Sequence, residues 1–209
     1  MKSYEKWFVL IISAIIVMSC IKESDGRPIN ANANAEYVGC AGASYDDWET
    51  SPYVLPFPVG KTYSINLAHC SGSYHAGGEP DQFAIDFDMG HGAEVTAARD
   101  GVVVFVEESG FDGEFPNNKV VLQHEDRSHT QYMHLTYQGA LVSKGQVVKK
   151  GDVLGLTGAT GLAGYPHLHF VATGGRWKYP YSSFPVTFSN TSENTFSLEP
   201  GKVYTALAY

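Results

Sequence analysis

His167 and His169 are the residues of this 209-residue sequence that first suggest chemistry. They are two positions apart in the segment 166–174, and a β-strand places residues of that spacing on the same face. Leu168 and Phe170 alternate with them and are expected to face the core. Neutral imidazoles bind metal ions and transfer protons near neutral pH. Two such histidines are consistent either with a metal or catalytic site or with a solvated face.

Asp86 provides a carboxylate in a second segment with strand-like alternation, 81–90. Phe83, Ile85 and Phe87 alternate with small or polar residues, so we expect them to form a core face. Asp86 then lies on the opposite face, where a carboxylate is either solvated or a ligand for a cation.

A third expected strand, 130–135, contributes another histidine. Its alternation predicts that Met133 and Leu135 face the core, whereas Tyr132 and His134 face outward. Taken together, the three strands offer one carboxylate and three imidazoles on the polar faces of one small sheet. Carboxylates and imidazoles are side chains that can bind a metal ion or act as acid–base catalysts.

Short β-branched or aromatic runs, separated by loops rich in Gly, Asn, Pro and Asp, indicate an all-β protein. Few helices are expected, because no segment beyond the N-terminal apolar run has a sustained helical period. The expected architecture is a small antiparallel β-sheet or barrel-like sandwich. Strands are expected at 101–108, 118–125, 129–135, 166–174, 184–190 and 202–209, and a strand folded at glycine corners at 141–158.

The order of these motifs resembles the LytM/lysostaphin-type zinc metallopeptidases, peptidase family M23. DFDMGHGAEVTAARDGVV begins at Asp86, and it is followed by YMHL (132–135), a glycine-rich stretch at 145–161 and HLHF (167–170). The resemblance covers about residues 54 to 174. It implies a LytM-type fold, which is a duplicated, barrel-sandwich-like β motif.

The resemblance also implies roles for single residues. In this family a His, an Asp and the second His of an H-x-H motif bind one Zn²⁺. Carried over, Asp86 and His169 are zinc ligands, and His134 and His167 assist catalysis. One Zn²⁺ per chain is therefore the expected cofactor.

The chain departs from the family pattern at the first ligand. The pattern places a His four residues before Asp86, where this chain has Gln82, and an amide oxygen is a poor zinc ligand. His75 precedes Asp86 by eleven residues, across a loop with two glycines and a proline that can turn back. The order SYH…QFAIDF resembles a displaced arrangement found in some family members, so His75 is the expected third ligand. A degenerate site is the alternative, and His69 is a second candidate for the ligand.

The expected reaction follows from this ligand set. Zinc with three protein ligands and one open position activates a water molecule and polarises a scissile carbonyl. His134 and His167 would then transfer protons, and Tyr132 or Tyr74 could add a donor to the oxyanion. The remaining histidines, His91, His124 and His129, lie in or beside expected turns and are interpreted as solvated.

The family resemblance implies that the substrate is a peptide bond of peptidoglycan, in a stem peptide or a cross-bridge. The loops 111–118 and 158–166 are expected to flank the cleft. One alternative is a catalytically degenerate protein that binds the cell wall or activates another hydrolase, which Gln82 would favour. A biotinyl- or lipoyl-like carrier is excluded, since the expected hairpin tip at 155–161 contains no lysine.

The N-terminal residues predict export. Lys2 and Lys6 precede an apolar run at 8–18, which is too short to span a bilayer and is typical of a signal peptide. The run ends at VMSC (17–20), which resembles a bacterial lipobox and makes Cys20 the expected lipidated residue. An ordinary signal peptide or an uncleaved anchor is the alternative. The chain is expected in the cell envelope, periplasmic or at the outer membrane, touching the membrane through a lipid anchor only.

Charge and cysteine content complete the prediction. A net charge of −8 without basic runs argues against nucleic-acid binding. The protein is also expected to be a monomer. With Cys20 assigned to the anchor, Cys40 and Cys70 are expected to form a disulfide, although two buried thiols are the alternative. The expected organisation is a signal peptide at 1–19, a lipidated cysteine and tether at 20–36, the peptidase domain at 37–175 and a β extension packed on it at 176–209.

Overall fold

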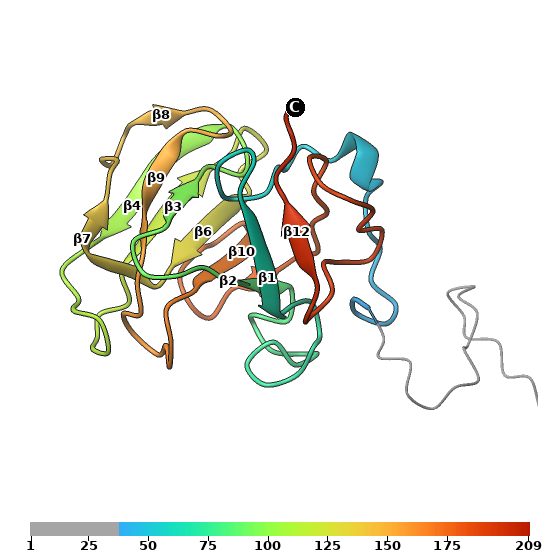
Figure 1. The fold of residues 1–209 in the computed structure, drawn as a ribbon, viewed down its shortest axis with the longest axis horizontal. Helices are drawn as coiled ribbons and strands as arrows, with labels where there is room; N and C mark the ends of the chain where they lie inside the picture. The colour runs from blue at the N-terminus through green and yellow to red at the C-terminus, as the bar shows by residue number, and fades with distance from the viewer. Residues whose placement is uncertain (1–37) are drawn as a thin grey trace, which may run out of the picture. The chain divides into compact units, whose positions relative to one another are not determined.

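The computed structural model describes residues 38–209; the signal peptide, the lipidated Cys20 and the tether expected at 1–36 lie outside the described residues. Within 38–209 the regular secondary structure is β, apart from the 3₁₀ helix η1 (Trp48–Thr50), which is the one helical element of this part (Figure 1). No helix of this part is long and apolar enough to cross a membrane. The strands are β1 (Thr62–Leu67), β2 (Ala84–Asp88), β3 (Glu94–Thr96), β4 (Gly101–Glu107), β5 (Lys119–Gln123), β6 (His129–Met133), β7 (Leu135–Ala140), β8 (Val147–Val148), β9 (Val153–Thr157), β10 (Leu168–Gly174), β11 (Ser182–Ser183) and β12 (Val203–Thr205).

Antiparallel pairing organises these strands into two sheets. The large sheet has the order β12-β1-β2-β10-β6-β5-β4-β8, with β11 paired to β10, and the small sheet has the order β3-β9-β7. Strands β2 and β10 are therefore neighbours although 79 residues separate their ends. The expectation of an all-β, antiparallel fold is confirmed.

Residue alternation in β2 and β10 separates the core from the polar face of the large sheet. Ile85, Phe87, Leu168 and Phe170 are fully buried and belong to the main hydrophobic cluster. Burial of each of these side chains contributes about 1.5–3 kcal/mol. Asp86, between Ile85 and Phe87, faces the other side of the sheet, as the alternation predicts.

Strand β6 faces the opposite way from the prediction. Tyr132 is fully buried in the core, where its hydroxyl accepts a hydrogen bond from the Ala98 N–H at 2.8 Å. Met133 lies on the other face, and a positive φ of 64° at His134 then interrupts the alternation before Leu135 returns to the core. This backbone conformation is uncommon outside glycine. Because it lies in the core, Tyr132 is unable to act as an oxyanion donor. Met133 and His134, in contrast, both line a cavity on the other side of the sheet.

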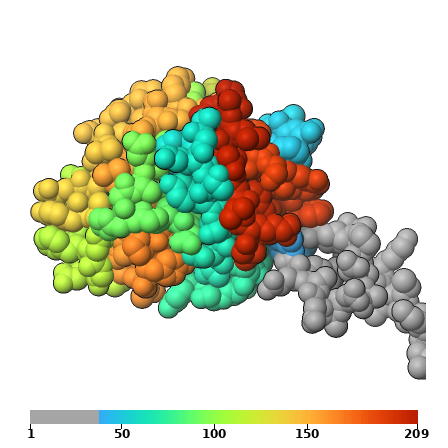
Figure 2. All heavy atoms as spheres, viewed as in Figure 1, coloured from blue at the N-terminus to red at the C-terminus, as the bar shows by residue number. Residues whose placement is uncertain are grey.

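The C-terminal residues contain less strand than expected. The segment 184–190 is not a strand, because Asn194 takes the place of a pairing strand. Its side-chain amide accepts from the Phe188 N–H at 2.8 Å and donates to the Phe188 carbonyl at 2.9 Å. In 202–209 only β12 forms, and it pairs with β1 along one edge of the large sheet (Figure 1). The space-filling view shows the C-terminal residues, in red, at the surface beside cyan to blue-green residues (Figure 2).

Candidate active site

Three buried side chains converge on the polar face of the large sheet. His169 Nδ1 lies 2.9 Å from Asp86 Oδ1, and His75 Nε2 lies 3.4 Å from the same oxygen. One ligand atom from each residue lies within 4.8 Å of the other two. Zinc bonds of roughly 2.0–2.2 Å in tetrahedral geometry separate ligand atoms by about 3.4 Å, so this donor set fits Zn²⁺. We call these three residues the metal triad.

The electrostatics of the triad favour a cation. Burial raises the pKa of Asp86, but hydrogen bonds from His169 and His75 outweigh it and hold that pKa well below its usual range. Burial lowers the pKa of His169, but hydrogen bonds to Asp81 and Asp86 outweigh burial and raise it. A buried, ionised carboxylate needs a positive charge beside it, and a metal ion can supply that charge in place of a proton on His169.

Strand pairing fixes two members of the triad. His169 in β10 and Asp86 in β2 are direct partners in the antiparallel register. Side chains of directly opposed residues in such a pair point to the same face of the sheet. The core side chains that flank both residues hold the strands in this register, because a slip by one residue would turn Asp86 into the core.

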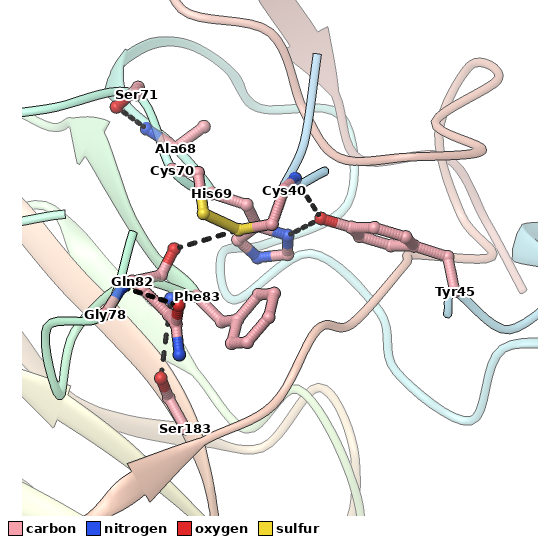
Figure 3. Close-up of a disulfide and its surroundings, with 10 residues drawn as sticks. All are labelled: Cys40, Tyr45, Ala68, His69, Cys70, Ser71, Gly78, Gln82, Phe83 and Ser183. Atoms are coloured by element: carbon pink, nitrogen blue, oxygen red, sulfur yellow. Dashed lines mark hydrogen bonds between the residues drawn. A yellow bond between two sulfur atoms is a disulfide. The ribbon is translucent and has the colours of Figure 1, made fainter. Parts of the chain in front are cut away.

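His75 comes from a loop between β1 and β2, and that loop is held at both ends. A disulfide joins Cys40 to Cys70 (Figure 3), and the Cys70 N–H donates to the Gln82 carbonyl at 2.8 Å. The Gln82 side chain accepts from the Gly78 N–H at 2.9 Å. Gln82, which stands where the family pattern has a ligand, therefore holds the loop that carries His75.

His134 and His167 lie beside the triad, with ring centroids 4.6 Å apart. His134 Nδ1 is 2.7 Å from the Thr160 carbonyl oxygen, and His167 Nδ1 is 2.9 Å from the Tyr165 carbonyl oxygen. Each Nδ1–H therefore donates to the backbone, which leaves Nε2 as the free acceptor of a neutral ring. His167 Nε2 lies 3.8 Å from Asp86 Oδ1. Burial lowers the pKa of both rings, to about 3 for His134.

A cavity of about 330 Å³ opens over these five residues. The loops expected to flank the cleft supply part of its wall, through Asn117, Leu162 and Tyr165. Ser73 and Tyr74 also line the cavity; they come from the loop of His75, which was not expected to form part of the wall. Tyr74 is 67% exposed, so a ligand in the cavity can reach it.

His69 lies outside the triad. Its ring is buried, its Nδ1 is 3.2 Å from the Tyr45 hydroxyl, and it stacks on the Tyr45 ring (Figure 3). The second candidate for the third ligand thus packs beside the disulfide between Cys40 and Cys70.

The interpretation of the remaining histidines as solvated is right only for His91. That side chain is 55% exposed and pairs with Asp112 at 2.9 Å. His124 and His129 are buried, which corrects the prediction. The turn residues beside them do not expose them, because His124 Nδ1 donates to the Asp100 carbonyl at 2.7 Å and its ring packs inward.

Two residues near the triad were missed by sequence reasoning. Asp81 Oδ1 lies 3.3 Å from His169 Nε2, and the Tyr181 hydroxyl donates to the same Asp81 oxygen. Asp81 precedes Gln82 in a polar turn, and Tyr181 lies after β10, so no spacing rule connected them with His169.

The fold and the site define a class: an antiparallel β domain with a His–Asp–His cluster that could hold a metal ion on one sheet face. Residues 81–179 match the model of peptidase family M23, and the chain is a member of that family. Asp86, His134, His167 and His169 lie inside the matched residues, whereas His75 lies before them.

Individual relatives are similar over part of the chain. The peptidoglycan DD-endopeptidase ShyA of Vibrio cholerae serotype O1 is 42% identical over 85 residues, which are 41% of this chain and 18% of that protein. An uncharacterized metalloprotease of Buchnera aphidicola subsp. Baizongia pistaciae is 34% identical over 124 residues, 58% of this chain and 31% of that protein. This chain therefore spans less than a third of the length of either relative. The crystal structure of a zinc-containing peptidase from Vibrio cholerae has 31% identity and a TM-score of 0.45, covering 58% of this chain and 37% of that one.

Proposed function

We propose that this protein is an exported zinc metalloendopeptidase that hydrolyses peptide bonds of peptidoglycan. The observation that carries the proposal is the convergence of His75, Asp86 and His169 beside the free Nε2 atoms of His134 and His167. Membership of peptidase family M23 supports it, as does the similarity to a peptidoglycan DD-endopeptidase.

The metal triad would hold one Zn²⁺ through His75 Nε2, Asp86 Oδ1 and His169 Nδ1. When bound, Zn²⁺ supplies a Lewis acid for the scissile carbonyl and lowers the pKa of a water molecule. Two imidazoles and one carboxylate that line a cavity are a donor set typical of catalytic zinc.

His134 and His167 would carry the proton transfers. Each presents Nε2 to the cavity, because its Nδ1–H is donated to a backbone carbonyl. A neutral Nε2 can accept the proton of the attacking water, and the resulting Nε2–H can donate to the departing amine or to the oxyanion. The carbonyls of Thr160 and Tyr165 keep both rings in the tautomer that this role requires.

We also propose that the protein acts outside the cytoplasm, where peptidoglycan is accessible. The N-terminal pattern supports this, with residues 1–19 as a signal peptide and Cys20 as the lipidated residue of an envelope lipoprotein. Residues 176–209 would form an extension of the peptidase domain, which acts as a monomer on peptides of the cell wall.

Digestion of purified peptidoglycan tests the proposal. The zinc-loaded protein should release new amino termini from the polymer, and a chelator should stop this release until zinc is added back. The H134A variant serves as the control for contaminating hydrolases. Zinc-loaded protein that releases no peptide from peptidoglycan, yet increases release by another wall hydrolase, would contradict the proposal and indicate an activating protein.

A further inference from the structure

Asp81 contacts the side of His169 that faces away from the metal triad. His169 Nδ1 points to Asp86 Oδ1 at 2.9 Å, and His169 Nε2 points to Asp81 Oδ1 at 3.3 Å. The His169 side chain is 9% exposed, so both ring nitrogens depend on these protein partners rather than on solvent. The ring thus lies between two carboxylates: Asp86, which belongs to the metal triad, and Asp81, which does not.

The tautomer of His169 decides whether it can ligate a metal. A neutral imidazole has one N–H and one lone pair, and a metal ligand must offer the lone pair. If Nδ1 carried the proton, it would donate to Asp86 and the ring could not act as a ligand at that atom. A proton on Nε2, donated to Asp81, leaves Nδ1 free for the metal.

Tyr181 fixes the position of Asp81. Its hydroxyl donates to Asp81 Oδ1, and its ring is buried in a small cluster with Ala84, Met133 and Val171. An aromatic ring packed in this way has few alternative rotamers, so the hydroxyl is a rigid donor. The Asp81 side chain itself is 23% exposed and would otherwise be free to turn to solvent.

A strand pairing and a hydrogen bond bring Tyr181 and Asp81 together. Strand β11 pairs with β10, which places Ser182 and Ser183 opposite Gly174 and Thr173 and sets Tyr181 at the edge of the large sheet. The Phe83 N–H donates to Ser183 Oγ at 3.4 Å, which connects β11 to the turn that carries Asp81 (Figure 3). Tyr181 lies beyond the residues matched by the family model.

We infer that Asp81, held by the Tyr181 hydroxyl, is a positioning residue that keeps His169 in the Nε2–H tautomer and so raises the zinc affinity of the metal triad. Mutation of a carboxylate that accepts the second N–H of a ligating histidine typically lowers metal affinity by about 10–100-fold. The inference rests on the proposed function, because it takes His169 as a zinc ligand.

Zinc affinity, measured on the whole purified protein by competition with a chromophoric chelator, tests this inference. D81N should raise the zinc Kd by about 10–100-fold. Y181F should raise it by a smaller factor, since the carboxylate remains but loses its fixed donor. E79Q is the matched control, because Glu79 is an exposed carboxylate two residues before Asp81 whose side chain has no hydrogen bond or ion pair with a histidine within residues 38–209. Its Kd should equal that of the wild type.

The tautomer gives a second readout that a merely structural role would not change. In zinc-loaded wild-type protein labelled with ¹⁵N-histidine, the His169 Nε2–H should give a slowly exchanging, downfield proton resonance. D81N should shift this resonance and speed its exchange, and E79Q should leave it in place. D81S, a second variant that removes the same carboxylate, should have the same two effects as D81N.

A D81N protein with the zinc Kd and the His169 resonance of the wild type would overturn the inference. An equal loss of affinity in D81N and E79Q would also overturn it, because the effect would then be one of general charge. These outcomes can be distinguished from a failure of the proposed function. A wild-type protein that binds zinc tightly but leaves peptidoglycan intact would contradict only that function.

Discussion

His169 and Asp86 are opposed residues of the β10–β2 pairing, and the same register that buries Phe170 and Phe87 places His169 Nδ1 2.9 Å from Asp86 Oδ1. The site is therefore built on a part of the sheet whose other face is fully buried. Two members of the triad come from this rigid pairing, and the third, His75, comes from a loop. The position of His75 should therefore depend on the contacts that hold its loop, whereas the sheet itself holds Asp86 and His169.

Replacing His169 should remove zinc while the sheet remains folded. H169A deletes a ligand without touching the core side of β10, so we expect the zinc content after dialysis to fall from one ion per chain to near zero. Elemental analysis of the dialysed protein measures this. H91A is the control, because His91 is exposed and bonds to Asp112 and Thr136, outside the metal triad. Full zinc occupancy in H169A would refute the ligand assignment.

Replacing His134 should separate metal binding from turnover. His134 Nε2 faces the cavity, whereas its Nδ1 contacts the backbone and not the triad. H134A should therefore keep its zinc and lose about 10²–10⁴-fold in kcat on peptidoglycan, the usual effect of removing an acid–base group. The measurement is zinc content and initial rate on the same preparation. A variant with normal turnover would exclude His134 from catalysis.

Alternation and motif spacing were sufficient to predict the antiparallel β fold and the outward direction of Asp86 and His169, because both depend on local patterns of period two. The direction of Tyr132 could not be predicted in this way. It depends on the positive φ at His134, which is a rare conformation for a residue with a side chain.

Contacts that strand alternation does not encode set the remaining features. The 184–190 segment looks like a strand, but the backbone N–H and carbonyl of Phe188 bond to the Asn194 side chain. The partnership of Asp81 with His169 joins residues 88 positions apart and has no signature in either local segment. Such pairs appear only when the register of the whole sheet is known.

The disulfide should matter for the position of His75 as well as for stability. It closes a 30-residue separation between Cys40 and Cys70, and the second cysteine lies five residues before His75. The double variant C40A/C70A should lower the free energy of unfolding by about 3 kcal/mol, since the unfolded chain regains freedom. It should also weaken zinc binding, because the loop of His75 loses one of its two attachments.

Denaturant unfolding of the zinc-free protein and zinc competition on the folded protein separate these two effects. Q82A is the companion variant, because it removes the hydrogen bond to Gly78 and leaves the disulfide in place. We expect it to weaken zinc binding with a cost to stability of only about 1 kcal/mol. Zinc affinity that is unchanged in both variants would show that the position of His75 does not depend on these attachments.

The buried His124 should make stability depend on pH. Burial lowers the pKa of His124 to about 4, from about 6.5 in the unfolded chain. Between these values the unfolded state binds the proton and the folded state does not, so stability is complete above about pH 6.5 and falls as the pH drops toward 4. The difference corresponds to about 3 kcal/mol. In H124N, which keeps a donor toward the Asp100 carbonyl but cannot titrate, the free energy of unfolding should fall less over this range. Parallel denaturant titrations of wild type and H124N at several pH values measure the difference, and identical pH dependence would show that His124 is not the group responsible.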